Sequence, residues 1–364
     1  MRRFTFLLCA IVFAIAASTS NAAAQPSVTS ERLADDIYLL RAPEALDFWT
    51  ATNSVVIVND QDVVVFDSFT RPSTARMAIA AIRKITSKPV RTLINSHWHQ
   101  DHWRGNDEFV KAFPGLQIIT TVETRDYMRR MQNGFLINGT RAQLARERDA
   151  LASGKNADGS PVTAERRREL ETLSAERARF AEEMAAAPFV VPDVAYRGEL
   201  TFWRGTREFR LLTMTGDATA SSVLYLPNEK ILVTGDVLVS PENGDGPPPW
   251  TTNSYAIAPW LDSLRRMGAL ETTVIVPGQG PAMRDKTYLT LTTSLFAAIT
   301  TQVHAALERG LFKVDEVVAA VNVDTIGRQY PGGVVGANTP FQRWVATIAR
   351  KVLQEALDGI VPSN

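Results

Sequence analysis

The sequence has almost no cysteine, no excess of charge of either sign and few histidines. Of its 364 residues, only Cys9 is a cysteine, so neither an internal disulfide nor a cysteine-based zinc site can form. The 39 basic and 39 acidic side chains cancel, which gives no electrostatic reason to expect a nucleic-acid partner. Three of the four histidines lie within six residues of one another. This cluster is the most informative feature of the sequence.

The first 24 residues have the pattern of an export signal. A basic start is followed by the apolar run Phe4–Ala17 and by the small residues Ala22–Ala24. The run is too short for a comfortable transmembrane span. We therefore expect cleavage after Ala24 and a periplasmic or secreted protein with no stable membrane insertion.

Strand-like and helical segments alternate along the rest of the chain. Strands are predicted at Ser54–Asp60, Asp62–Phe66, Arg91–Asn95, Gln117–Thr121, Phe209–Met214, Ser222–Leu226, Lys230–Thr234 and Thr273–Val276. Helices are predicted at Thr74–Ser87, Asp107–Phe113, Thr124–Gln132 and Trp260–Leu270, and the chain after Asp285 is mostly helical. This order predicts an α+β fold in which two sheets pack between helical layers.

Residues 140–187 interrupt this order. They are rich in Ala, Arg, Glu and Leu, with a turn at Gly154–Pro161, which predicts a helical hairpin. Its second half carries an apolar stripe of Leu170, Leu173, Phe180 and Met184. The stripe could pack on the parent domain, form a homodimer contact or cover the site. We therefore divide the chain into a signal peptide (1–24), a main domain (25–285) with this insertion, and a helical C-terminal extension (286–364).

The histidine cluster runs from His97 to His102 and follows a predicted strand. Side chains at i and i+2 of an extended segment point to the same side, so His97 and His99 can meet one cation. Asp101 and His102 can face a second position nearby. Imidazole suits zinc, copper, iron and nickel, and carboxylate extends the choice toward iron and manganese.

With this loop the sequence resembles the metallo-β-lactamase superfamily, whose hallmark is a His-x-His-x-Asp-His loop in a four-layer αββα sandwich. Asp67 matches the acidic residue that ends an early strand in that family. The runs Leu224–Pro227 and Ile231–Asp236 resemble its strand pair ending in the metal-bridging aspartate. Val274–Gly278 resembles the strand that delivers the last ligand. The resemblance implies a metal-dependent hydrolase.

Two positions depart from the family pattern. Asp217 follows Gly216 where the family usually has a histidine, and Gln279 replaces the histidine of the usual Pro-Gly-His-Gly. Carried over residue by residue, the resemblance implies two metal positions. The first would have His97, His99, Asp217 and a shared Asp236, and the second would have Asp101, His102, Asp236 and Gln279.

These departures change the expected chemistry. A third carboxylate lowers the net positive charge of the site and weakens acidification of a bound water. Gln279 offers only a neutral amide oxygen, so we expect the second position to be looser or empty. One or two zinc ions are expected, with iron or manganese as alternatives. Asp101 or Asp217 would act as general base.

Aromatic residues near the predicted metal loop suit a flat or apolar organic substrate. Trp49, Trp103 and Trp250 are candidate substrate contacts. Arg104 could bind a substrate carboxylate or pair with Asp107.

The function expected from these features is an exported metal-dependent hydrolase. A metal-activated water would attack an ester, lactone or lactam-like amide bond of a small molecule. One alternative is a binding protein of the same fold with weakened catalysis. Another is an iron-dependent oxygenase, in which His97, His99 and Asp217 hold the iron.

Overall fold

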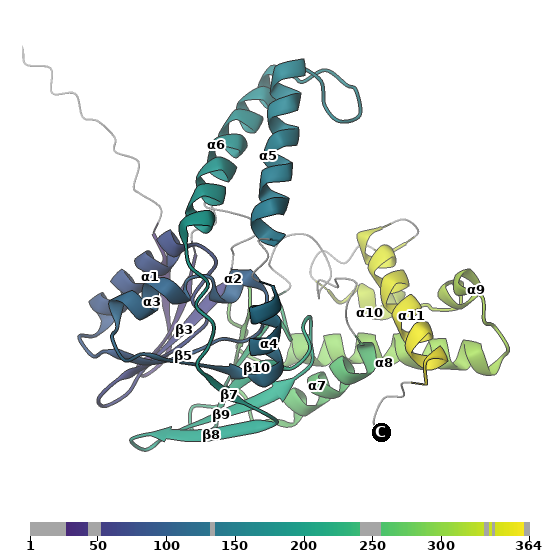
Figure 1. Cartoon of the computed structure of the whole chain (residues 1–364). Helices are drawn as coiled ribbons and strands as arrows, with labels where there is room; N and C mark the ends of the chain where they lie inside the picture. The colour runs from purple at the N-terminus through teal and green to yellow at the C-terminus, as the bar shows by residue number, and fades with distance from the viewer. Residues whose placement is uncertain are drawn as a thin grey trace, which may run out of the picture.

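The computed structural model describes residues 27–42, 52–131, 135–240, 256–330, 335–336 and 339–359. Within these residues, two β-sheets pack face to face between helices (Figure 1). The first sheet has the order β1-β2-β3-β4-β5-β6-β7 and the second has the order β12-β11-β10-β9-β8. This is the four-layer αββα sandwich that the sequence predicts.

The strands of the first sheet are β1 (Thr29–Ala34), β2 (Ile37–Arg41), β3 (Asn53–Val58), β4 (Val63–Phe66), β5 (Val90–Ile94), β6 (Gln117–Thr121) and β7 (Val194–Tyr196). Those of the second are β8 (Glu199–Arg204), β9 (Arg207–Met214), β10 (Ser221–Leu226), β11 (Ile231–Gly235) and β12 (Val274–Pro277). Strands β4 to β7 run parallel, as do β11 and β12. Parallel neighbours end at the same edge of a sheet, so the loops after them gather there.

Three apolar layers hold the sandwich together. The inner layer joins the two sheets through residues such as Val55 and Phe66 on one side and Leu224 on the other. Helices α1 (Pro72–Ile85) and α3 (Asn106–Ala112) cover the outer face of the first sheet. Helices α7 (Ile257–Ala269), α8 (Thr287–Glu308) and α11 (Pro340–Leu357) cover the second. The short helices α9 (Val314–Ala319) and α10 (Asp324–Gly327) lie beside them.

The helices after residue 285 share one core with the second sheet. Phe296 of α8 and Ile348 of α11 belong to the same buried cluster as Val223 of β10 and Ile275 of β12. This C-terminal segment therefore supplies part of the outer layer of the sandwich.

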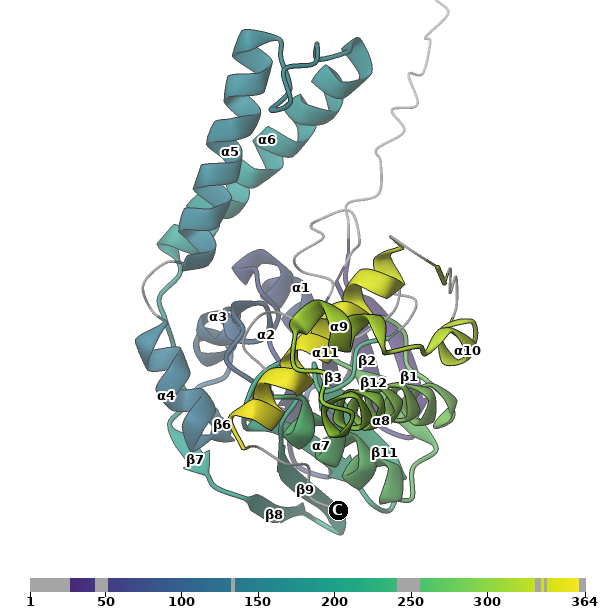
Figure 2. The same cartoon turned by 90° about the vertical axis from the view of Figure 1, so that its right-hand side faces the viewer.

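The insertion forms the predicted helical hairpin, with α5 (Phe135–Ser153) and α6 (Ala164–Ala186). It projects from the sandwich in two perpendicular views (Figures 1 and 2). Phe180 and Met184 are buried against Ile137 of α5, so this part of the apolar stripe joins the two helices to each other. The base of α6 is held by Glu183, whose carboxylate accepts the backbone N–H of Ser73 at the start of α1.

Candidate metal centre

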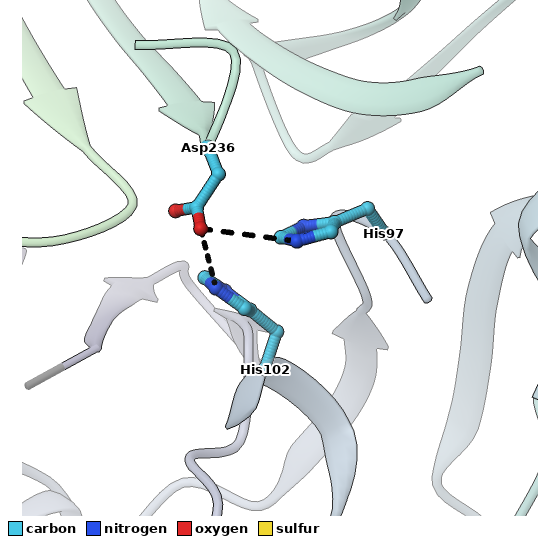
Figure 3. Close-up of side chains that lie close together, drawn as sticks. All are labelled: His97, His102 and Asp236. Atoms are coloured by element: carbon cyan, nitrogen blue, oxygen red, sulfur yellow. Dashed lines mark ion pairs between the residues drawn. The ribbon is translucent and has the colours of Figure 1, made fainter. Parts of the chain in front are cut away.

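The predicted ligands lie where strands of both sheets end. The loop after β5 leads through His97 and His99 into the short helix α2 (Gln100–Trp103). Asp236 follows β11, Gln279 follows β12, and Asp217 lies between β9 and β10. Segments far apart in the sequence therefore meet at one edge of the sandwich. Figure 3 shows Asp236 pointing from one side toward His97 and His102 on the other.

The side chains form two groups with metal-ligand spacing, and Asp236 belongs to both. One group is His97, His102 and Asp236, and the other is His99, Asp217 and Asp236. Within each group the ligand atoms lie within 4.8 Å of one another. Asp236 Oδ2 is 3.9 Å from His97 Nε2 and 3.3 Å from His102 Nε2. His99 Nδ1 is 3.4 Å from Asp217 Oδ1.

The grouping differs from the one implied by the family pattern. His97 shares a group with His102, whereas the resemblance pairs His97 with His99 and Asp217. The α2 turn brings the centre of the His102 ring to 4.2 Å from the centre of the His97 ring. The centre of the His99 ring lies 4.7 Å from that of His97. Asp101 Oδ2 lies 3.2 Å from His102 Nε2.

Gln279 also reaches this cluster, so all seven predicted ligands lie together. Its Nε2 is 3.3 Å from Asp236 Oδ2 and 3.5 Å from Asp101 Oδ2. In this orientation the amide acts as a hydrogen-bond donor to two carboxylates.

The buried ligand atoms fit a cation. His97 and His102 are fully buried, and the Nε2 atoms of both make no hydrogen bond. Oδ1 of buried Asp236 makes none either. Buried polar atoms normally have partners, so the two Nε2 atoms, at 3.9 and 3.3 Å from Asp236 Oδ2, indicate a site for a divalent ion. Nitrogen and carboxylate donors together suit zinc, iron or manganese.

Hydrogen bonds behind the imidazoles aim their Nε2 atoms at the site. Asp67 accepts the backbone N–H and the hydroxyl of Ser96, both at 2.7 Å, and lies 2.8 Å from His102 Nδ1. The Ser96 hydroxyl gives its one hydrogen to Asp67, so at 2.9 Å it can only accept from His97 Nδ1. In the neutral form of each ring the proton therefore lies on Nδ1 and the lone pair on Nε2. The backbone of Asp67 adopts the left-handed conformation, with φ of 60°, which is strained for a residue other than glycine.

Burial and neighbouring charges shift the titration of the cluster. Burial lowers the pKa of His97 well below its ordinary value, helped by His102 and His99. Burial also lowers the pKa of His99. For His102, burial acts in the same direction, but Asp236, Asp101 and Asp67 outweigh it and raise its pKa well above the ordinary value. Burial works to raise the pKa of Asp101, but His102 outweighs it and the pKa is lowered.

The loops that carry Asp236 and Gln279 pack too closely for larger residues. A Cβ at Gly278 would lie 1.9 Å from Asp236 Oδ1, so glycine is required there. Asn53 Nδ2 donates to the carbonyls of Pro277 at 2.8 Å and Gly280 at 2.7 Å. These bonds fix the turn that presents Gln279.

Two sequence-based expectations around the site need correction. Trp103 is fully buried and its ring N–H donates to the Trp98 carbonyl at 2.9 Å, so it packs beneath the loop and offers no face to a substrate. Arg104 is also buried. It donates to the main-chain carbonyls of Met184, Ala187 and Pro188, at 2.9 to 3.1 Å, and so caps the end of α6. Trp49 and Trp250 lie outside the described residues.

A stacked aromatic pair lies beside the loop, and sequence reasoning missed its second member. The Trp98 ring lies 4.2 Å from the His99 ring, and Tyr127 of α4 (Val122–Arg130) stacks on Trp98 at 5.5 Å and 25°. Trp98 stands inside the histidine cluster, which is a signal in itself. No local pattern indicates Tyr127, because it meets Trp98 only in the folded chain.

Comparison with known proteins identifies the family. Residues 47–279 match the Metallo-beta-lactamase superfamily, and the chain belongs to it. A linear primary-alkylsulfatase from a Pseudomonas species is 24% identical over 298 residues, which cover 81% of this chain and 53% of the relative. The chain therefore spans about half the length of the curated relative it matches.

Solved structures share the fold. The stereoselective inverting sec-alkylsulfatase Pisa1 from Pseudomonas sp. has a TM-score of 0.57 and 18% identity, over 91% of this chain and 50% of that one. TMB-1 has a TM-score of 0.50 and 16% identity, over 75% of this chain and 98% of its own. The relatives support a hydrolase family for this protein.

Proposed function

We propose that this protein is a metal-dependent hydrolase that cleaves an ester-type bond of a small anionic molecule. The observation that carries the proposal is the pair of ligand groups that share Asp236. When bound there, divalent ions would polarise the scissile bond and activate a water molecule. Zinc is the first metal to test, with manganese and iron beside it.

Asp101 is the best placed of the carboxylates to accept a proton. Its side chain is 23% exposed, whereas those of Asp217 and Asp236 are 8% and 4% exposed. A water molecule can therefore reach Asp101 from solvent. Its position beside His102 and Gln279 keeps it ionised and oriented. Asp217, grouped with His99 and Asp236, is assigned to metal binding.

A sulfate ester is the first substrate class to test. A linear primary-alkylsulfatase matches 81% of this chain in sequence. Three carboxylates at the site disfavour highly charged anions, and a sulfate monoester carries a single negative charge. Carboxylic esters, lactones and lactam-like amides form the second group of substrates.

The test is a substrate screen of purified protein loaded with zinc, manganese or iron. We expect release of sulfate from octyl sulfate, and loss of this activity on chelation or in Asp236→Asn. If the protein hydrolyses a chromogenic cephalosporin and not octyl sulfate, its substrates are lactam amides and not sulfate esters. Metal-loaded, folded protein that turns over no member of the panel would contradict the hydrolase and favour the binding protein. Oxygen consumption with a persulfide would favour the iron oxygenase.

We also propose that the protein is exported. Residues 1–24 carry the signal pattern and lie outside the described residues. Among the described residues, no helix is both long and apolar enough to cross a bilayer. Cell fractionation and N-terminal sequencing would be expected to find the chain outside the cytoplasm and beginning at Gln25.

We propose further that the α5–α6 hairpin forms a homodimer contact. It projects from the sandwich as a long arm (Figures 1 and 2). Light scattering of the full chain is expected to give twice the chain mass. Replacing the hairpin by a short Gly-Ser linker should give the monomer mass. A monomer for the intact chain at high concentration would refute the contact.

A further inference from the structure

A continuous stack of side chains leads outward from His99. The Trp98 ring meets the His99 ring edge to face, at 4.2 Å and 75°. Tyr127 stacks nearly parallel on Trp98, and the Arg130 guanidinium lies 5.1 Å from the centre of the Tyr127 ring. The stack begins at a side chain of the metal centre and ends on the outer turn of α4.

Part of this stack faces solvent. Tyr127 is 37% exposed, Trp98 is half-buried, and His99 itself is 19% exposed. Exposed apolar surface beside a polar site is typical of ligand contact, since it is the part of the surface that a ligand covers. We call the exposed surface of Trp98 and Tyr127 the aromatic ledge.

The charge at the outer end of the ledge favours anions. Arg129 and Arg130 form the last turn of α4, and both are exposed. Arg130 also donates to the main-chain carbonyl of Asp126, which keeps its guanidinium near Tyr127. An anionic molecule approaching the metal centre along the ledge is therefore attracted at the outer end first.

We propose that the aromatic ledge binds the apolar group of an anionic ester while the ester group lies at the metal centre. This assignment rests on the proposed hydrolase function and names its substrate class: esters whose organic group is a flat ring or an alkyl chain of several carbons. Stacked aromatic faces accept such groups without hydrogen bonds. The ledge therefore selects for apolar length and shape.

The test measures binding, so it does not depend on turnover. Butane-, hexane- and octanesulfonate, which resemble alkyl sulfates but lack the ester oxygen, are titrated into zinc-loaded full-length protein by calorimetry, below micelle-forming concentrations. We expect affinity to rise about fourfold for each added methylene that the ledge covers. Tyr127→Ala should flatten this dependence and weaken octanesulfonate binding about tenfold. Tyr127→Phe, which keeps the ring, should bind like the wild type.

Trp203 provides the matched control, because it is a 57% exposed tryptophan on β8, outside the ledge. Trp203→Ala should leave the chain-length dependence unchanged. An unchanged dependence in folded Tyr127→Ala would overturn the proposal. Turnover of octyl sulfate and 4-nitrophenyl acetate is measured alongside. If the protein turns over these esters but Tyr127→Ala leaves the chain-length dependence of sulfonate binding unchanged, the hydrolase stands and the ledge is overturned. If Tyr127→Ala weakens sulfonate binding as expected but neither ester is turned over, the hydrolase function is overturned and the ledge remains as a binding surface.

Discussion

The carboxylate of Asp67 lies 2.8 Å from Nδ1 of His102, on the side of the imidazole that faces away from the metal centre. Asp67 also accepts two hydrogen bonds from Ser96. One buried carboxylate therefore fixes the orientation of His102 directly and that of His97 through the Ser96 hydroxyl. Such partners set which imidazole nitrogen is available to a metal.

Asp67→Asn should weaken metal binding without removing any ligand. The amide has one acceptor oxygen for three donors, so one imidazole or Ser96 loses its partner. We expect metal affinity to fall by about 10- to 100-fold, measured by competition with a chromogenic chelator. Asp35→Asn, at a 95% exposed side chain, is the control. Wild-type affinity in folded Asp67→Asn would argue against this role.

Gln279→His should strengthen the looser metal position. The Gln279 amide donates toward Asp101 and Asp236, whereas an imidazole there would offer a lone pair to a cation. We expect elemental mass spectrometry to find about one zinc per chain in the wild type and a value approaching two in the variant.

The matching control is Gln279→Ala, which should keep about one zinc per chain because His97, His102 and Asp236 are untouched. Two ions in the wild type, with one lost in Gln279→Ala, would instead make the glutamine a ligand.

Arg104→Met should loosen the base of the hairpin. The buried guanidinium donates to three carbonyls at the end of α6 and lies 4.0 Å from the centre of the Phe189 ring. Losing these charge-assisted bonds should cost about 2–4 kcal/mol of unfolding free energy. Denaturant unfolding measures the loss, and hydrogen exchange should locate it at 183–189. Arg146→Met, at an exposed position on α5, should cost little. Equal stability of the two variants would contradict the cap.

The sequence was sufficient for the features set by local pattern. The histidine cluster and the Val-rich strands leading to Asp67 and Asp236 indicate where the site lies. The i, i+2 spacing also predicted that His97 and His99 share a cation, whereas in the structure His97 groups with His102. The edge strands β1 and β8 were not predicted, because one or both of their faces are exposed to solvent and the sequence there lacks a clear apolar pattern. β1 is mostly exposed, and β8 alternates between exposed and half-buried residues. Arg104 and Tyr127 escaped because their partners, 80 and 29 positions away, meet them only through tertiary packing.

A carboxylate links the C-terminal helix to α7 in the second outer layer. Glu355 of α11 accepts the backbone N–H groups of Ile257 and Ala258, the latter at 2.9 Å, in the first turn of α7. Burial raises the pKa of Glu355 above its ordinary value of 4.5, although these two bonds and Lys351 act against the rise. The folded protein therefore holds the Glu355 proton more tightly than the unfolded chain does.

This difference predicts the sign of a pH effect on stability. Between the ordinary and the raised pKa the folded state binds more protons, so the contribution of Glu355 to the unfolding free energy is full below the ordinary pKa and declines as pH rises through the raised one. The Tm of the wild type minus the Tm of Glu355→Gln should therefore decrease as pH rises from about 4 to about 7. Calorimetric melting at several pH values measures it. Glu169→Gln, on the exposed face of α6, should show no such trend. A Tm difference that moves in favour of the wild type with rising pH would mean that the hydrogen bonds, and not burial, dominate this carboxylate.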